Sequence, residues 1–354
     1  MKNKISVIVC AYNEEANIVN CINSLFAQTL ANEYFEVIIC DNSSTDNTYL
    51  LASNLITSSN KFNYKVIKIK HVDLSTSRNT ALKYASGDYV TYFDADAKID
   101  KNALLNLSKL IDDDTVDVVS GSVLNLNSNT KISNFFYNCH VKASIDASSG
   151  SKLVGANMTF KRSLLNRVKF LKGMKRGDET SLLVRLKAAI PTLNEVHAPD
   201  VVVYNDYPVK IYSWLKIMYT EGAMRFIIDS QFESQSRLVI VSKVFMRTSY
   251  IISCFVLFCN LFINLGVEIN SIAFLSILIR LNRALIYFKH SFINVSKGVF
   301  APLNVIMSLF TGCIFFALRD VGYISNFIKY YYSCPELTEE VSTVIDSVEN
   351  YNET

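Results

Sequence analysis

The sequence predicts an α/β domain with a mostly parallel sheet flanked by helices, followed by an α-helical transmembrane region. In residues 1–207, short β-branched runs alternate with segments of helical periodicity, as in sheets that are built from βαβ units. From residue 238 to about residue 332 the chain becomes strongly apolar, which accounts for the mean hydropathy of +0.21. Residues 333–354 carry six acidic residues and no Lys or Arg, so we expect a solvated acidic tail.

Apolar runs mark the expected strands of the first domain. Four of them lie at residues 5–10, 35–40, 65–70 and 89–93, and later candidates lie at 116–119 and 201–204. Helical patterns occupy residues 18–26 and 180–189. Polar or acidic residues directly follow the first, second and fourth runs. Ligands of open α/β sheets bind beyond the carboxyl ends of the strands, so we expect the functional site at those ends.

Composition narrows the classes of partner and the compartment. The net charge of +3 comes without a basic stripe, which argues against nucleic acid as a partner. The eight cysteines show neither a CxxC pair nor metal-ligand spacing, so we expect buried, reduced thiols. The first residues lead into a strand without an apolar signal region, which places the globular part in the cytoplasm.

Two uncharged stretches, residues 248–266 and 299–318, are long enough to span a bilayer. Residues 271–288 lie between them and contain Arg280 and Arg283, so this segment either crosses or lies in the interface. Basic residues flank the two uncharged stretches at Lys243, Arg247, Lys289 and Lys297. The positive-inside rule places both flanks in the cytoplasm and requires the middle segment to cross, which favours three spans over two.

Residues 208–247 connect the α/β domain to this apolar region. They combine Trp214 and several tyrosines with Lys or Arg at intervals, a mixture that suits helices at a membrane interface. An ordinary packed helix pair is the alternative. The sequence therefore predicts four parts: a domain at 1–207, juxtamembrane helices at 208–247, a transmembrane region of two or three helices at 248–332, and the tail at 333–354.

Asp94 and Asp96 flank Ala95 directly after the fourth apolar run. Two carboxylates one residue apart on a tight turn can present oxygens to one hard cation, so we expect Mg²⁺ or Mn²⁺ there. Such an ion bridges the phosphates of a nucleotide and neutralises a diphosphate leaving group. A solvated turn is the alternative for so short a pattern, and the neighbouring motifs favour the metal.

Four motifs appear in order around this turn: SVIVCAYNEE at 6–15, CDNSSTDNT at 40–48, SRN at 77–79 and GDYVTYFDAD at 87–96. Weaker pieces follow, GAN at 155–157 and GDETSLLVRL at 177–186. The set resembles the family 2 inverting glycosyltransferases, which have the GT-A nucleotide-sugar fold, over roughly residues 4–210. The resemblance implies transfer of a sugar, with inversion, from a nucleotide-sugar donor such as a UDP- or GDP-sugar.

The resemblance assigns roles to individual residues. Donor contacts fall on Ala11, Tyr12, Glu14, Asp41, Arg78, Asp94 and Ala95, metal ligation on Asp94 and Asp96, and the acceptor side on Asn157 and Arg185. Asp41 then accepts a hydrogen bond from a uracil-like N–H, and Arg78 lies near the diphosphate. Without the resemblance, an Asx turn and a surface helix position explain these two residues.

Inverting transfer needs a general base that deprotonates the acceptor hydroxyl. The family's base is the second acid of a Glu-Asp pair, and here the pair is reversed, as Asp178 and Glu179. By position Glu179 is the base, while Asp178 is the alternative. Two acids in the first turn of a helix are also favoured by the helix dipole alone. We expect Arg185 to tie this helix down.

Two further features depart from the family pattern. Asn205 stands where the family often has a metal-side His, and His197 precedes the last expected strand, where a structural role is favoured. The Gln-x-x-Arg-Trp motif of processive polysaccharide synthases is absent after Trp214, which favours transfer of a single sugar.

The sequence therefore predicts a multi-pass cell-membrane enzyme with a cytoplasmic catalytic domain. It adds a sugar to a membrane-presented or lipid-linked acceptor during surface glycan or polysaccharide biosynthesis. A polyprenyl-phosphate sugar transferase is one alternative. A degenerate, non-catalytic membrane protein of the same fold is the other; the reversed pair and the missing His favour it, and the intact Asp41, Asp94 and Asp96 oppose it.

Overall fold

The computed structural model describes residues 3–59, 63–112, 114–126, 137, 153–174, 176–208, 210–232, 243–248, 251–252 and 317–328. The chain divides into two compact units. The first comprises Met1–Asn134 and Ser148–Tyr207, and the second comprises Phe135–Ala147 and Pro208–Thr354.

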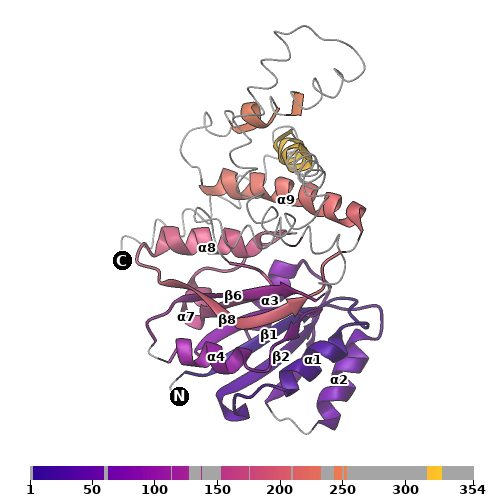
Figure 1. Ribbon diagram of the computed structural model, residues 1–354, viewed down its shortest axis with the longest axis vertical. Helices are drawn as coiled ribbons and strands as arrows, with labels where there is room; N and C mark the ends of the chain where they lie inside the picture. Colours follow the sequence, from indigo (N-terminus) through magenta and orange to yellow (C-terminus); the bar gives the residue numbers. More distant parts are fainter. Residues whose placement is uncertain are drawn as a thin grey trace, which may run out of the picture. The chain divides into compact units, whose positions relative to one another are not determined.

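An eight-stranded sheet with the order β3-β2-β1-β4-β7-β6-β8-β5 forms the first unit (Figure 1). The strands are β1 (Ile5–Ala11), β2 (Phe35–Asp41), β3 (Tyr64–Lys68), β4 (Tyr89–Asp94), β5 (Lys98–Ile99), β6 (Val118–Asn125), β7 (Asn157–Lys161) and β8 (Glu195–Asn205). Strands β3, β2, β1 and β4 are parallel to one another, but β7 runs antiparallel to both β4 and β6. The expected mostly parallel sheet is therefore a mixed sheet, because β7 reverses the direction in its middle.

Helices cover both faces of this sheet. One face packs against α1 (Ile18–Phe26), α2 (Thr48–Ser58) and α4 (Ala103–Leu110), and the other against α3 (Leu74–Leu82), α7 (Arg162–Arg167) and α8 (Asp178–Ala189). A short 3₁₀ turn, η1 (Asn32–Tyr34), precedes β2. Each face has its own cluster of buried apolar side chains, so the unit has an α/β/α architecture.

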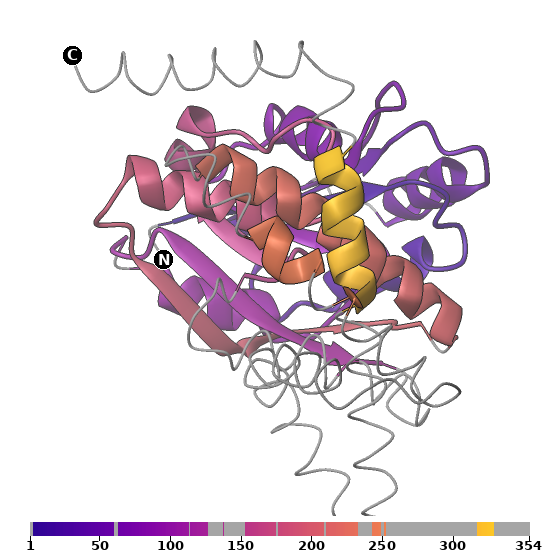
Figure 2. The same cartoon turned by 90° about the horizontal axis from the view of Figure 1, so that it is seen from above.

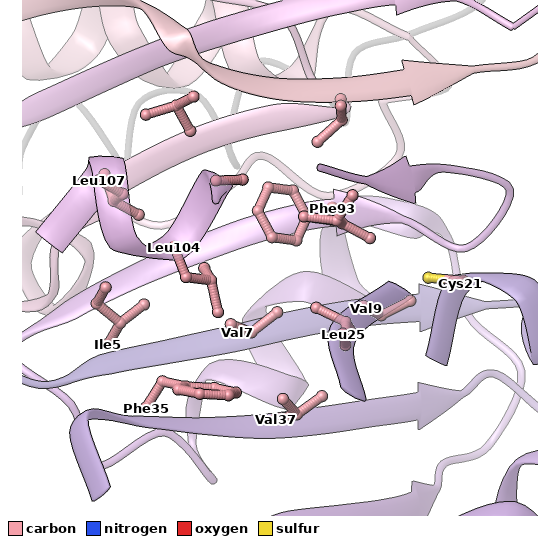
Figure 3. Close-up of a cluster of buried hydrophobic side chains, with 14 of the residues drawn as sticks. Ile5, Val7, Val9, Cys21, Leu25, Phe35, Val37, Phe93, Leu104 and Leu107 are labelled. Carbon is pink, nitrogen blue, oxygen red and sulfur yellow. The ribbon is translucent and has the colours of Figure 1, made fainter. Parts of the chain in front are cut away.

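The alternation of side chains along β1 explains the two cores. Ile5, Val7 and Val9 point to one face, where they pack with Leu25 of α1 and Leu104 of α4 (Figure 3). Ile8 points to the opposite face and joins the other cluster. A strand that is apolar on both sides is expected in the middle of a sheet that is covered on both faces.

Strand register brings the polar strand ends together. Ala11 pairs with Asp41 at the last position of β1 and β2, and Cys10 pairs with Asp94 of β4. The residues that follow these three strands therefore meet at one edge of the sheet, as the sequence predicts. Among the described cysteines, Cys10, Cys21 and Cys40 are free thiols; Cys21 and Cys40 are buried, as expected, whereas Cys10 is half-buried.

Two expected element boundaries are corrected. Helix α8 begins at Asp178 rather than at residue 180, because Gly177 adopts φ +75° and lets both acids enter the first turn, where the helix dipole favours them. His197 lies within β8 and not before it, because residues 195–198 pair with 118–121 of β6 ahead of a register shift. Its Nδ1 lies 3.0 Å from the Ser120 carbonyl oxygen, a structural contact.

The second unit contains α9 (Ile211–Phe232) and the helical segments 243–248 and 317–328. Helix α9 crosses segment 317–328 closely (Figure 2), since a Cβ at Gly222 would collide with the Arg319 carbonyl oxygen. Arg247 forms an ion pair with the buried Asp320 at 2.5 Å and stacks on Tyr323. The expected juxtamembrane role of residues 208–247 stays a prediction.

The expected spans at 248–266, 271–288 and 299–318 lie outside the described residues, apart from a few positions at their ends. The expected acidic tail at 333–354 lies outside them entirely. Of the helices that the structure does describe, none has both the length and the hydropathy that crossing a bilayer requires.

Candidate active site

Asp41 ends β2 and is buried, with 1% of its surface exposed. One carboxylate oxygen, Oδ2, accepts a long hydrogen bond from the Ser44 backbone N–H at 3.3 Å. The other, Oδ1, is buried without a hydrogen-bond partner. Because an unpaired buried acceptor is costly, this oxygen is suited to receive an N–H from a ligand at the strand end.

The loop after β1 is held against the loop after β2. Asn13 has φ 56° and its Oδ1 accepts from the Thr45 backbone N–H at 2.9 Å, while its own N–H donates to Ser44 Oγ at 3.0 Å. Ser43, with φ 57°, donates from Oγ to the Ile69 carbonyl at 2.7 Å. Two non-glycine residues in the left-handed region are uncommon and cluster at functional sites.

Tyr12 is an exposed aromatic side chain at this edge, and His71 lies beside it. Their ring centroids are 4.5 Å apart with planes tilted by 42°. The His71 ring is placed through Nδ1, 3.1 Å from the Asn42 carbonyl oxygen, and both groups of the Asn42 side-chain amide bind the Val72 backbone. The sequence reasoning did not include His71, because it follows β3, which has no acidic ending to draw attention to it.

Asp94 and Asp96 lie at the end of β4 and in the turn before β5. Burial, together with the negative charges of Asp94 and Glu14, raises the pKa of Asp96 to about 7. Burial also raises the pKa of Asp94, although Arg78 opposes this. Asp96 is half-buried, which argues against the solvated turn that was the alternative. Carboxylates that are poorly solvated and close together repel one another. A bound cation would relieve this repulsion.

The pair of Asp94 and Asp96 can hold a divalent metal that also binds water and substrate phosphates. Among the described residues no group of three or more His, Cys, Asp or Glu side chains is arranged to hold a metal. Mg²⁺ commonly uses one or two carboxylates together with water and substrate phosphates, which two aspartates can satisfy. Ala95 between them is buried in the core, while the Glu14 carboxylate accepts from Asn17 Nδ2 at 2.9 Å.

Arg78, on α3, connects Asp94 with the beginning of α8. Its Nη1 lies 2.6 Å from Asp178 Oδ2, and its Nη2 lies 3.4 Å from Asp94 Oδ1 and 3.3 Å from the Gly155 carbonyl oxygen. The arginine is buried, so it is not the surface helix residue that was the alternative to a donor contact. Burial lowers its pKa, but Asp178 and Asp94 outweigh this and raise it.

The two acids at the start of α8 have different surroundings. Asp178 is buried and bound to Arg78, whereas Glu179 is half-buried. Burial raises the pKa of Glu179 to about 8, and the neighbouring Asp178 carboxylate contributes in the same direction. A carboxylate with a raised pKa is a stronger base than one held by an arginine.

Asn157 and Arg185, expected on the acceptor side, make structural contacts. Asn157 is buried, and its Nδ2 donates to the carbonyl oxygens of Ser122 at 2.9 Å and Val201 at 2.8 Å, which links β7 to β6 and β8. Arg185 donates from Nη2 to the Lys169 carbonyl at 2.6 Å, a contact that links α8 to the segment before it. Their acceptor-side roles stay predictions.

Comparison with known proteins agrees with this geometry. Residues 6–168 match the family model for glycosyl transferase family 2. This part of the chain is similar to the family 2 glycosyltransferases, and its mixed sheet flanked by helices is of the GT-A type. The mannosyltransferase PcManGT of Pyrobaculum calidifontis, solved in complex with GDP-Man and Mn²⁺, has a TM-score of 0.60, with coverage of 93% of this chain and 88% of that one. At 18% identity this likeness shows the fold alone.

Two curated relatives are transferases that act on poly(ribitol-phosphate). TarS of Staphylococcus aureus, a β-N-acetylglucosaminyltransferase, is 36% identical over 118 residues, which is 33% of this chain and 20% of TarS. A β-glucosyltransferase of Bacillus spizizenii is 28% identical over 181 residues, which is 50% of this chain and 28% of the relative. The chain thus matches less than a third of the length of either relative.

Proposed function

We propose that the chain is a metal-dependent, inverting glycosyltransferase that moves one sugar from a nucleotide-sugar donor to an acceptor at a membrane. The observation that carries the proposal is the position of Arg78 between Asp94 and Asp178. Arg78 brings together the acids at the end of β4 and those at the start of α8, which are far apart in sequence. Sugar transfer requires a general base beside the donor site, and this arrangement provides one.

The base subsite favours uracil. Asp41 has one unpartnered oxygen, since the other already accepts from Ser44. Uracil offers a single imide N–H, whereas guanine offers adjacent N–H groups that a carboxylate receives with both oxygens. Tyr12 and His71 provide aromatic faces beside Asp41 on which a pyrimidine can stack. We therefore propose a UDP-sugar rather than a GDP-sugar.

Asp94 and Asp96 would hold Mg²⁺ or Mn²⁺. When bound, the ion supplies charge neutralisation to the diphosphate as it leaves. Ionised carboxylates are needed for this, and the pKa of Asp96 is raised first by burial and then by the neighbouring Asp94 and Glu14 charges, which a bound cation would offset.

Glu179 is the proposed general base. It accepts the proton of the acceptor hydroxyl while that oxygen attacks the anomeric carbon from the side opposite the leaving diphosphate. Asp178 is engaged by Arg78 in a short ion pair. The reversed order of the two acids thus leaves the second position, here a Glu, free to act as the base.

For the acceptor we propose a membrane-presented or lipid-linked glycan or polyol phosphate of the cell surface. The poly(ribitol-phosphate) acceptors named for the two curated relatives support this. The apolar stretches after residue 248 also support attachment to the membrane, with the catalytic domain on the cytoplasmic side. A lipid phosphate in place of a sugar hydroxyl as acceptor would make the chain a polyprenyl-phosphate sugar transferase.

A donor screen tests the proposal. The full-length chain is incubated with a panel of UDP- and GDP-sugars in Mg²⁺, Mn²⁺ or chelator, and release of the nucleoside diphosphate is measured. We expect release from a UDP-sugar in the presence of metal, and Asp41→Asn should weaken UDP binding about 10- to 100-fold. The exposed Asp200→Asn is the matched control. Turnover of GDP-sugars alone would overturn the uracil assignment, and no binding of any nucleotide would favour the non-catalytic alternative.

A further inference from the structure

Arg78 is the centre of the contacts described above, and its surroundings differ from those of a ligand-binding arginine. Its side chain is 5% exposed. The guanidinium carbon lies 5.6 Å from the ring centroid of Phe170 and 6.0 Å from that of Tyr92. A diphosphate contact, as the family resemblance implies, would require this group to leave a closed environment in which two carboxylates already bind it.

The three groups that Arg78 binds belong to three separate segments. Asp178 opens α8, Asp94 ends β4, and Gly155 lies just before β7. A Cβ at Gly155 would lie 3.4 Å from Glu179 Oε2 and 3.7 Å from Arg78 Nη2. The backbone at Gly155 therefore passes close to both the proposed base and the arginine, which couples their positions.

The two ion pairs are unequal. The Asp178 contact is short, at 2.6 Å between two nearly buried side chains, and the Asp94 contact is long, at 3.4 Å to a side chain that is 37% exposed. Arg78 is thus anchored by Asp178, while Asp94 keeps oxygen lone pairs available for a cation. Asp94 can bind a metal without displacing Arg78 from α8.

We propose that Arg78 is a positioning residue, which holds Asp178 and with it the first turn of α8, so that Glu179 stands in a fixed relation to Asp94. This inference rests on the proposed function for its catalytic consequence. Arg78 acts through α8 and does not contact the substrate. The planar fork of arginine can bind two carboxylates and a carbonyl at once, whereas lysine offers a point charge without that geometry.

Arg78→Lys keeps the charge and removes the fork, so it tests the geometry. We expect kcat to fall about 100-fold, since small misplacements of a catalytic group cost that much. The KM for the donor and the Kd for UDP with Mn²⁺ should stay within about twofold of wild type. Arg167→Lys, the same substitution at an exposed arginine of α7, is the control and should leave all three values unchanged.

A second readout does not depend on turnover. Amide hydrogen exchange in the first two turns of α8 should be faster in Arg78→Lys than in wild type or Arg167→Lys, because the turn has lost its anchor. Asp178→Asn should lower kcat in the same way. The double variant Arg78→Lys with Asp178→Asn should be no slower than the worse single variant, since both changes break one interaction.

If Arg78→Lys does not fold, Arg78→Gln with Asp178→Asn removes the cation and its anion together and leaves no unpaired charge between them. This variant should fold, retain UDP binding and show the same loss of kcat. A loss of UDP affinity by about 10-fold or more with unchanged kcat would overturn the proposal and make Arg78 a diphosphate ligand. Unchanged α8 exchange would also overturn it. Absence of turnover in the wild type would instead contradict the proposed function, and α8 exchange would still decide the role of Arg78.

Discussion

Ala11 and Asp41 stand opposite each other at the last paired position of the parallel strands β1 and β2. The nucleotide-side residues are therefore carried by the rigid centre of the sheet, and Tyr12 and Asn42 follow immediately on either side. Sites on central strands are held more accurately than sites on loops. Substitutions of polar residues just beyond these strand ends are accordingly expected to change binding and catalysis more than folding.

Asp96→Asn should remove the dependence of donor turnover on divalent cations and reduce turnover by at least about 100-fold, because one of two carboxylate ligands is lost. Thermal stability should not fall, since the change relieves repulsion with Asp94 and Glu14. Mn²⁺ affinity, measured by calorimetry, and the melting temperature check both expectations, with Asp200→Asn as the exposed control. Near wild-type turnover in Asp96→Asn would show that the metal assignment is wrong.

Glu179→Gln should lower kcat by about two to four orders of magnitude while donor binding survives, because Gln keeps the size and loses the basicity. Glu33→Gln, on the exposed turn η1, is the control. In the wild type, kcat should rise with pH until Glu179 is ionised, near its pKa of about 8. A full loss in Asp178→Asn with none in Glu179→Gln would move the base to Asp178.

The raised pKa of Glu179 also predicts a change in folding stability. The folded state holds this proton more tightly than the unfolded state, so stability is complete below the unfolded pKa of about 4.5 and declines as the pH rises through about 8. Glu179→Gln removes this contribution, and its unfolding free energy should depend less on pH across that window. Denaturant unfolding of both proteins at several pH values measures the difference. If the unfolding free energies of the two proteins depended equally on pH, the raised pKa of Glu179 would be contradicted.

Glu36, the buried second residue of β2, should show the opposite pH dependence. Its carboxylate accepts from Ser6 Oγ at 2.7 Å and from the Ser86 N–H and Oγ, and these bonds with Lys65 outweigh the effect of burial and lower its pKa. Glu36→Gln should cost about 1–3 kcal/mol of unfolding free energy at neutral pH. This contribution is present above the unfolded pKa and is lost as the pH falls through the folded pKa. The unfolding free energies of the wild type and Glu36→Gln should therefore converge at acid pH. A difference in unfolding free energy that stays constant with pH would show that Glu36 is not ionised in the folded protein.

The membrane proposal predicts the sidedness of labelling. Residues 248–266 and 299–318 would each form about 28 to 30 Å of helix, enough to cross the hydrocarbon core. In intact cells an impermeant thiol reagent should not label an engineered cysteine in residues 1–200. It should label one placed after Pro335 if residues 271–288 also cross. Labelling within residues 1–200 would contradict the orientation.

Much of the first unit could be predicted from the sequence, because local signals and tertiary structure agree there. The apolar runs that end at Cys10, Cys40 and Phe93 are strands with the expected order of motifs, and their ends meet. The reversal at β7 could not be predicted, since strand direction depends on the connection between β6 and β7 and not on the run itself. The membrane region stays a prediction, because it lies outside the described residues.

Single-residue roles were harder to predict than elements. The pattern around Asp94 and Asp96 identified the acidic turn, but not that Asp96 is half-buried, because burial depends on segments that lie far from it in the sequence. Arg78 was expected near the diphosphate, whereas the structure pairs it with Asp178, a residue of another helix. Contacts between segments so distant along the chain leave no periodic signal for sequence reasoning to detect.

The pairing of β5 with β8 has a consequence for the order of folding. Lys98 and Ile99 pair with Tyr204 and Val203, and the Asp100 N–H donates to the Val202 carbonyl, so the turn that holds Asp96 is braced by the last strand of the sheet. During synthesis the parallel half can form while the ribosome still holds β8, and the acidic turn reaches its final form only when that strand emerges. Competence to bind a cation should therefore be among the last properties that the nascent domain acquires.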